Sequence, residues 1–430
     1  MKRTIAKSTL MATVAISMLT ASCSTQKKAQ SDAAAFGESA VASRPAPGHN
    51  IDEQYLVLSE AQQQLIDKNN AFALKLFSGV SQLSSTVVSP ISVPYLMGML
   101  ANGADGDTRN EIMKTIGADG VNIDEMNALY KSIMENGSKL DKATTIKIAN
   151  YMAANKNISL KEGFTNTVKT NYMAGIESLD FTSSKSADKI NNWCKKQTDG
   201  MIPSIIDNTD PNAVAYIMNA IFFIGAWTKK FTKSQTKDER FQGYTRNIQT
   251  VKMMHQENKL LYTNADDFAA VRLPYGNGEY AMTVMLPHDG KSIDDIMKGM
   301  TTEKLKQTQY AMQNCTVDLK LPRFTNEVET SLNEIIAKLG APSIFNAGNA
   351  NFSNMTDAAM SVSKMLQKAK IEVSEEGTKA AAVTAAIMTM SLQPDEPQKV
   401  TFHANKPFVY MITNRTTGAI LFIGQYVGAE

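Results

Sequence analysis

Apolar positions recur at helical spacing in the first half of the chain. After Ser59, an apolar stripe on one helical face runs through Leu65, Ile66, Phe72, Ala73, Leu76 and Phe77, which predicts an amphipathic helix. The preceding Ser-Glu-Ala-Gln at 59–62 has the pattern of a capping box. Further helices are predicted at 91–104, at 108–117 with Asp107 as its cap, and at 183–200.

Strand-like patterns dominate the second half. Residues 143–154 alternate between polar and apolar, while 213–227 are almost entirely apolar, as in a strand covered on both faces. Residues 269–287 contain Gly276-Asn277-Gly278, the signature of a hairpin turn. Strands are also predicted within 315–324, 400–414 and 418–427. Because helices gather early and strands late, the pattern indicates a mixed α and β (α+β) fold with large sheets.

One segment fits no single element. Residues 375–392 read EEGTKAAAVTAAIMTMSL, which has helical propensity in its middle but no clean apolar stripe. At a period of two, the face from Thr378 to Met390 carries no charge, and no proline interrupts residues 371–393. The flanking acids, glycine and prolines are typical of an exposed loop. Composition alone favours a buried strand, and an exposed chain that can enter a sheet is the alternative.

The N-terminus has the pattern of a segment for export. Lys2, Arg3 and Lys7 precede a short apolar stretch, and Thr20, Ala21 and Ser22 then lead to Cys23. We interpret residues 1–22 as a signal peptide, since the apolar run is too short to span a bilayer. Its end resembles a bacterial lipobox, which would make Cys23 the lipidated residue. The alternative is an ordinary cleaved signal. Residues 23–57 are predicted to be a flexible tether and 58–430 a single domain.

The composition excludes several function classes. Lys and Arg total 44 against 42 Asp and Glu in 430 residues, so the charge is balanced and does not indicate nucleic-acid binding. The chain has four His and no HExxH, CxxC, P-loop or GxSxG motif, which argues against an enzyme, a metal site or a cofactor. Cys194 and Cys315 are far apart and are expected to be unpaired core residues.

The motif E-E-G-T-x-A-A-A-x-T at 375–384 resembles the hinge of the inhibitory serpins, the serine protease inhibitor family. Residues 87–112, 219–231, 321–324, 403–412 and 420–426 resemble other serpin motifs in family order. Together they extend over about 69–427. This resemblance implies a serpin fold with about three β-sheets, eight to nine helices and an exposed reactive loop at 375–398.

The resemblance also implies a mechanism. A target serine protease would attack the loop and form an acyl-enzyme, and the cleaved loop would then insert into the central sheet and trap it. The protein would be consumed and would not be an enzyme. Thr378 to Met390 suit insertion, because a charge or a proline on the buried face would cost several kcal/mol or a ladder hydrogen bond.

Functional residues follow from the same resemblance. The cleaved bond would be Met390–Ser391 or Ser391–Leu392. The opening of the sheet would depend on Ser89, Ser92, Asn219 and Trp227, on a pair between Glu375 and Arg323, and on Gln367 where the family usually has His. The hinge would comprise Glu375, Glu376, Gly377, Thr378, Ala380, Ala381, Ala382 and Thr384.

The expected partners follow from the loop and the N-terminus. Residues 380–398 contain no Lys or Arg, so elastase-, chymotrypsin- or subtilisin-like proteases fit better than trypsin-like ones. Papain-like cysteine proteases are a further target class. We expect an exported monomer, either an envelope lipoprotein anchored through Cys23 or an extracellular protein. The alternative function within the family is a non-inhibitory carrier or chaperone.

Overall fold

The computed structural model describes residues 56–80, 83–245, 247–378 and 397–428. By its internal contacts the chain divides into the units Met1–His49 and Asn50–Glu430, and the described residues all belong to the second. Cys23 and the predicted loop residues Ala380, Ala381, Ala382, Thr384, Met390, Ser391 and Leu392 lie outside them.

The described residues contain nine α-helices, in agreement with the eight to nine expected. They are α2 (Glu60–Val80), α3 (Ser92–Gly103), α4 (Gly106–Thr115), α5 (Ile123–Asn136), α6 (Glu162–Tyr172), α7 (Lys185–Gln197), α8 (Ile293–Lys298), α9 (Thr302–Tyr310) and α10 (Asn333–Leu339). None of these helices is long and apolar enough to cross a membrane.

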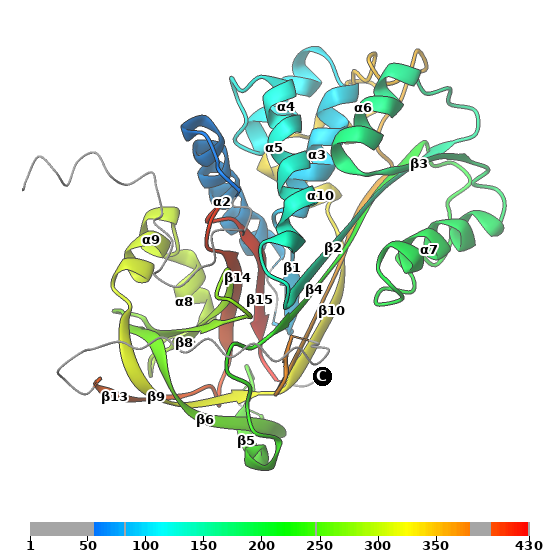
Figure 1. The fold of residues 1–430 in the computed structure, drawn as a ribbon. Helices are drawn as coiled ribbons and strands as arrows, with labels where there is room; N and C mark the ends of the chain where they lie inside the picture. The colour runs from blue at the N-terminus through cyan, green and yellow to red at the C-terminus, as the bar shows by residue number, and fades with distance from the viewer. Residues whose placement is uncertain (1–55, 81–82, 246, 379–396, 429–430) are drawn as a thin grey trace, which may run out of the picture. The chain divides into compact units, whose positions relative to one another are not determined.

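Six strands form the sheet that carries the predicted hinge (Figure 1). Their order across the sheet is β10 (Phe324–Ser331), β11 (Lys364–Ser374), β12 (Gly377–Thr378), β4 (Ala215–Ala226), β2 (Thr144–Asn155) and β3 (Gly175–Leu179). β4 is buried along nearly its whole length, as its apolar sequence predicts.

Helices cover both faces of this sheet. On β2, Tyr151 and Ala153 pack in one cluster with Ile190 and Cys194 of α7. The intervening Met152 belongs to the cluster that contains α3. The alternation along β2 therefore buries successive side chains on opposite faces, and α7 stands on the side away from α3 in Figure 1.

The remaining nine strands form a second hydrogen-bonded sheet. Where about three sheets were expected, the described strands form two, because the 17-residue β6 pairs with β5 at residues 248–253, with β9 at 253–262 and with β7 at 261–264. The strands are β1 (Thr86–Val88), β5 (Lys237–Gln242), β6 (Ile248–Asn264), β7 (Phe268–Pro274), β8 (Tyr280–Pro287), β9 (Gln313–Pro322), β13 (Lys399–His403), β14 (Phe408–Asn414) and β15 (Ile420–Tyr426).

Local sequence signals are mostly confirmed. Ser59 and Gln62 form the reciprocal bonds of a capping box, and β7 and β8 pair across the Gly276–Gly278 turn. Cys194 and Cys315 are buried and unpaired. The prediction that Asp107 caps a helix was wrong: α4 begins at Gly106, so Asp107 lies inside its first turn.

Candidate functional site: the two roots of the predicted reactive loop

The predicted reactive loop begins inside the six-stranded sheet. We call the strands at its two ends, β12 and β13, the two roots of the loop. Gly377 and Thr378 form β12, which pairs with Val373 and Ser374 of β11 on one side and with Gly225 and Ala226 of β4 on the other. Thr378 is fully buried. Two residues of segment 375–392, which the sequence left open between strand and loop, are therefore part of a central strand.

The sheet closes after two open positions beyond this insertion. β11 and β4 pair with each other in parallel from Lys364 and Tyr216 to Lys370 and Phe222. A loop strand cannot occupy this part of the sheet while β11 and β4 share their hydrogen bonds. The described sheet is thus parted only at the end where β12 enters.

An aromatic stack supports the point of entry. The indole Nε1 of Trp227 donates to the carbonyl of Ser374 at 2.9 Å, and its ring stacks on Tyr275 with centroids 4.4 Å apart. The Tyr275 hydroxyl lies 2.7 Å from Thr378 Oγ1. Trp227 was predicted at this place. Tyr275 was missed, although it immediately precedes the Gly276–Gly278 turn and so lies at the end of a predicted strand.

Gly377 is required for this entry. Its φ is +141°, and a Cβ at this position would meet the carbonyl oxygen of Gly225 at 2.0 Å. Only glycine avoids both the strained backbone and the clash with β4. The structure therefore explains why the hinge motif has glycine at position 377.

The predicted ion pair between Glu375 and Arg323 is present, with Nη2 and Oε1 2.5 Å apart. Glu375 is only 2% exposed, whereas the Arg323 side chain is 48% exposed. Thr236 Oγ1 also donates to Glu375 at 2.7 Å. Burial raises the pKa of Glu375, but the hydrogen bonds from Arg323 and Thr236 outweigh it and hold the pKa below its ordinary value.

Glu376 is held more loosely. Lys230 Nζ lies 2.7 Å from its carboxylate and Lys233 Nζ 3.4 Å, and all three side chains contact solvent. The backbone is fixed as well, since Trp227 N donates to Glu376 O at 3.1 Å. The two acids that begin the motif are thus both paired, but only Glu375 is buried.

Polar groups beneath the closed part of the sheet form a first cluster around Ser89. Gln367 of β11 accepts from the Ser89 amide and donates to its carbonyl, each at 2.8 Å. Ser89 Oγ bonds to Ser92 Oγ at 3.1 Å and to the carbonyl of Leu421 at 2.7 Å. Gln367, which stands where the family usually has His, thus forms two hydrogen bonds with the backbone of Ser89.

Asn219 belongs to a second cluster. It lies opposite Gln367 in the β4–β11 register, but its Nδ2 donates to Asn150 Oδ1 at 2.9 Å, and Asn150 donates to the carbonyl of Tyr172. Within the described residues, the buried Asn219 Oδ1 has no hydrogen-bond partner. The predicted single polar cluster is therefore two clusters, one on each side of the β11–β4 seam.

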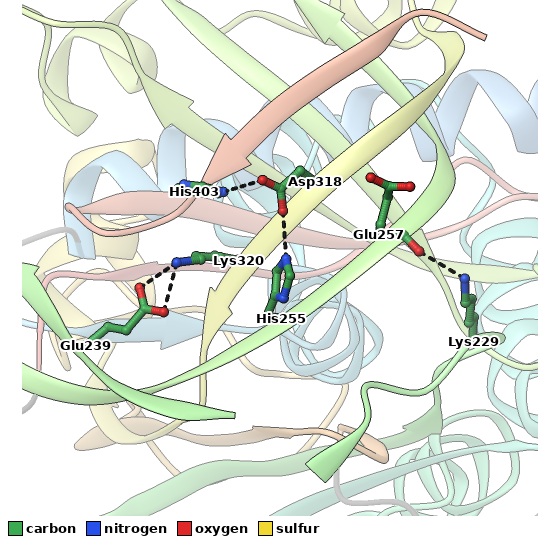
Figure 2. Close-up of polar contacts among 7 residues, drawn as sticks. All are labelled: Lys229, Glu239, His255, Glu257, Asp318, Lys320 and His403. Atoms are coloured by element: carbon green, nitrogen blue, oxygen red, sulfur yellow. Dashed lines mark hydrogen bonds and ion pairs between the residues drawn. The ribbon is translucent and has the colours of Figure 1, made fainter. Parts of the chain in front are cut away.

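The other root of the loop, β13, lies at the edge of the second sheet. Among the described strands it pairs only with β9, in parallel, from Lys399 and Thr316 to His403 and Lys320. Figure 2 shows that Asp318 of β9 lies between two imidazoles, with His255 Nε2 of β6 at 2.7 Å and His403 Nε2 of β13 at 3.0 Å. We call these three residues the histidine clasp.

The clasp lies beside a partly buried ion pair. Lys320, two residues along β9, bonds to both carboxylate oxygens of Glu239 at 2.8 and 2.9 Å (Figure 2). Burial raises the pKa of Asp318, but the hydrogen bonds from His255 and His403 outweigh it and lower the pKa of this carboxyl. Among the described residues, no group of His, Cys, Asp and Glu is arranged to hold a metal ion.

The family model for Serpin, serine protease inhibitor, matches residues 67–428 of this chain. The chain belongs to the serpin family. The match includes β11, β12, β4 and β13, so both roots of the reactive loop lie within it.

Individual serpins match over most of their length. The chain is 32% identical to leukocyte elastase inhibitor A of Rattus norvegicus, covering 84% of this chain and 99% of the relative. It is also 32% identical to the leukocyte elastase inhibitor of Homo sapiens, covering 85% and 99%.

Solved serpin structures share the fold. The thermophilic serpin tengpin in its native state matches with a TM-score of 0.78 and 27% identity, covering 87% of this chain and 96% of tengpin. Thyroxine-binding globulin in complex with thyroxine matches with a TM-score of 0.76 and 26% identity, covering 85% and 99%. The serpin fold, predicted from the hinge motif, is confirmed.

Proposed function

We propose that this serpin inhibits serine endopeptidases as a suicide substrate. The observation that supports this function best is the state of the six-stranded sheet. Its hinge strand β12 has entered between β11 and β4, while the rest of that seam is closed by direct pairing. Such a molecule has a prepared entry for a further strand and still has backbone pairing and burial to gain.

The reaction consumes one inhibitor for each protease. The catalytic serine Oγ adds to a loop carbonyl, the peptide C–N bond breaks, and the new amine leaves with the proton from the serine. The loop carbonyl stays on the protease as an ester. Insertion of the loop after β12 would separate the protease from its productive geometry before water hydrolyses this ester.

The loop sequence indicates the class of target. Because residues 380–398 contain no Lys or Arg, a protease pocket with a buried acid gains no ion pair from them. Met390–Ser391 and Ser391–Leu392 offer apolar or small residues, which suit elastase-, chymotrypsin- or subtilisin-like pockets. The relatives named leukocyte elastase inhibitor point to the same class. A papain-like protease could form the corresponding thioester.

The test is to incubate the purified chain with a panel of these proteases and with trypsin. We expect an SDS-stable complex with at least one elastase-, chymotrypsin- or subtilisin-like enzyme, and mass spectrometry of it would identify the acylated residue. Met390→Asp and Ser391→Asp place a charge at the predicted cleavage site and should lower the rate of complex formation. Cleavage of the loop at a normal rate without any stable complex would contradict the proposal.

We extend the proposal to export and lipid attachment at Cys23. The basic start, the short apolar stretch and the small residues before Cys23 support it. Residues 23–57 would then hold a monomeric serpin domain, 58–430, away from the membrane. Labelling with a fatty acid in a bacterial host should mark the wild-type chain and not Cys23→Ala. Equal labelling of both would contradict the anchor.

A non-inhibitory carrier remains the alternative function, because thyroxine-binding globulin shares the fold. The hinge argues against it. Thr378 is small, uncharged and already buried between β11 and β4, as strand insertion requires. The protease panel separates the two functions, since a carrier would be cut without forming a stable complex.

A further inference from the structure

Two side-chain hydrogen bonds to the hinge strand β12 are seen among the described residues: Ser374 Oγ of the neighbouring β11 donates to the carbonyl of Gly377 at 3.1 Å, and Tyr275, from outside the sheet, bonds to Thr378. Tyr275 OH and Thr378 Oγ1 are 2.7 Å apart, and both residues are fully buried. β12 itself is only two residues long and has two register pairs on each side. A strand this short has little stability of its own, so a buried hydrogen bond at its end contributes a large share of what keeps it in the sheet.

Tyr275 is well placed to act as a fixed anchor. Its ring stacks on Trp227 with an interplanar angle of 12° and meets the edge of Phe223 at 4.9 Å between centroids. Trp227 is in turn bonded to the carbonyl of Ser374 at the end of β11. The hydroxyl is therefore presented by a ring that contacts Phe223 of β4 directly and is linked to the end of β11 through Trp227.

The register shows where the next loop residues would pair. Thr378 lies opposite Val373 and Gly225, so the following residue would lie opposite Glu372 and Ile224. The second would lie opposite Ile371 and Phe223. These positions of β11 and β4 are not paired with each other, and the first closed pair is Lys370 with Phe222.

Two open positions therefore separate the anchored hinge from the closed seam. Starting a new strand costs conformational entropy before its contacts are gained, whereas extending a formed strand adds one step at a time. With Thr378 fixed in register, insertion of the cleaved loop is an extension and not a new start.

We propose that Tyr275 is a positioning residue for inhibition. Its hydrogen bond to Thr378 holds the hinge in register between β11 and β4, so that insertion outruns hydrolysis of the acyl-enzyme. The proposal rests on the proposed inhibitory function. Tyr275 would affect the ratio of cleaved free inhibitor to trapped complex, and not the rate at which the loop is cut.

The experiment measures the ratio of cleaved free inhibitor to trapped complex with pancreatic elastase, or with the panel protease that forms the most complex. For Tyr275→Phe and for Thr378→Val we expect this ratio to rise about fivefold, the factor that one buried hydrogen bond of about 1 kcal/mol represents. The rate of loop cleavage should stay unchanged. Thr378→Ser keeps a hydroxyl and should restore trapping.

Tyr280→Phe is the matched control. Tyr280 is also a buried tyrosine near Phe223, but its hydroxyl donates to the carbonyl of Gly137, away from the hinge. We expect Tyr280→Phe to leave the ratio unchanged. An unchanged ratio in Tyr275→Phe, or an equal rise in Tyr280→Phe, would overturn the proposal.

A second measurement needs no protease. Amide hydrogen exchange at Gly377 and Thr378 should be faster in Tyr275→Phe than in Tyr280→Phe, because the unpinned hinge leaves the sheet more often. Equal exchange rates at Gly377 and Thr378 in the two variants would overturn the proposal that Tyr275 holds the hinge. If the wild-type chain traps no protease, the proposed function fails, and this exchange experiment still decides whether Tyr275 holds the hinge.

Discussion

The two roots of the predicted reactive loop are built in opposite ways. The first root, β12, is a central strand paired on both edges, and its Thr378 is fully buried. The second root, β13, is an edge strand that pairs in parallel with β9 among the described strands. The partly exposed side chains of the histidine clasp also hold it. One root is therefore set in the core, and the other is fastened at the surface.

This difference assigns different work to the two roots. A buried site penalises any charge or misplaced polar group strongly, so the first root controls what enters the sheet. A partly exposed cluster gives small contributions that water screens, so the second root only holds the end of the loop in place. Equal substitutions at the two roots should have very unequal effects.

The largest contrast is expected from an arginine at each root. Thr378→Arg places a charge between β11 and β4, at a cost of several kcal/mol, whereas Thr401→Arg adds a charge to the exposed face of β13. We expect Thr378→Arg to be cleaved with almost no stable complex. Thr401→Arg should trap protease as the wild type does, and gel analysis after incubation measures both.

The hinge ion pair gives an intermediate effect. Arg323→Met leaves Glu375 buried without its cation, and should lower the melting temperature at pH 7 by about 5 °C, less than for a fully buried pair because Arg323 is half exposed. Lys233→Met removes a cation from the partly exposed Glu376 and should change the melting temperature by less than about 2 °C. Equal losses in both variants would contradict the contrast.

The pH dependence of that pair has a definite sign. The pKa of Glu375 is lowered in the folded protein, so its stabilisation is present above the ordinary value of 4.5 and is lost as the pH falls through the folded-state pKa. The gap in melting temperature between wild type and Arg323→Met should therefore narrow below pH 4.5. A constant gap from pH 7 to pH 3 would contradict this assignment.

The sequence predicted the parts of the hinge that depend on local chemistry. The motif at 375–384 and the run at 213–227 indicated the glycine, the buried threonine and the central strand. Arg323 and Trp227 were found because they lie in family motifs. Tyr275 and Thr236 were missed, because they lie outside the matching motifs and reach the hinge only through contacts between distant segments. Lys230 lies in the motif at 219–231, but its pairing with Glu376 was not predicted.

Register also explains the difference beneath the sheet. Gln367 and Asn219 were expected in one cluster and do lie opposite each other in the register of β11 and β4. Which partner each amide selects depends on side-chain reach across the sheet. Gln367 clamps the Ser89 backbone and Asn219 turns to Asn150, which no sequence pattern specifies.

The smallest effect is expected at the histidine clasp. Asp318→Asn removes the charge that accepts from His255 and His403, and should lower the melting temperature by less than about 2 °C. Amide exchange along β13 should become faster. Asp238→Asn, which breaks the exposed pair with Lys252 on the same sheet, is the control and should leave β13 unchanged. A loss as large as that of Arg323→Met would remove the contrast between the roots.

Inhibition by loop insertion requires that the intact chain has not yet reached its lowest free energy. The most direct measurement is the midpoint of thermal unfolding before and after a single cut within residues 380–392. Cleavage should raise the midpoint by on the order of 10 °C or more, because the freed loop extends β12 and fills the seam between β11 and β4. An unchanged or lower midpoint would contradict the account.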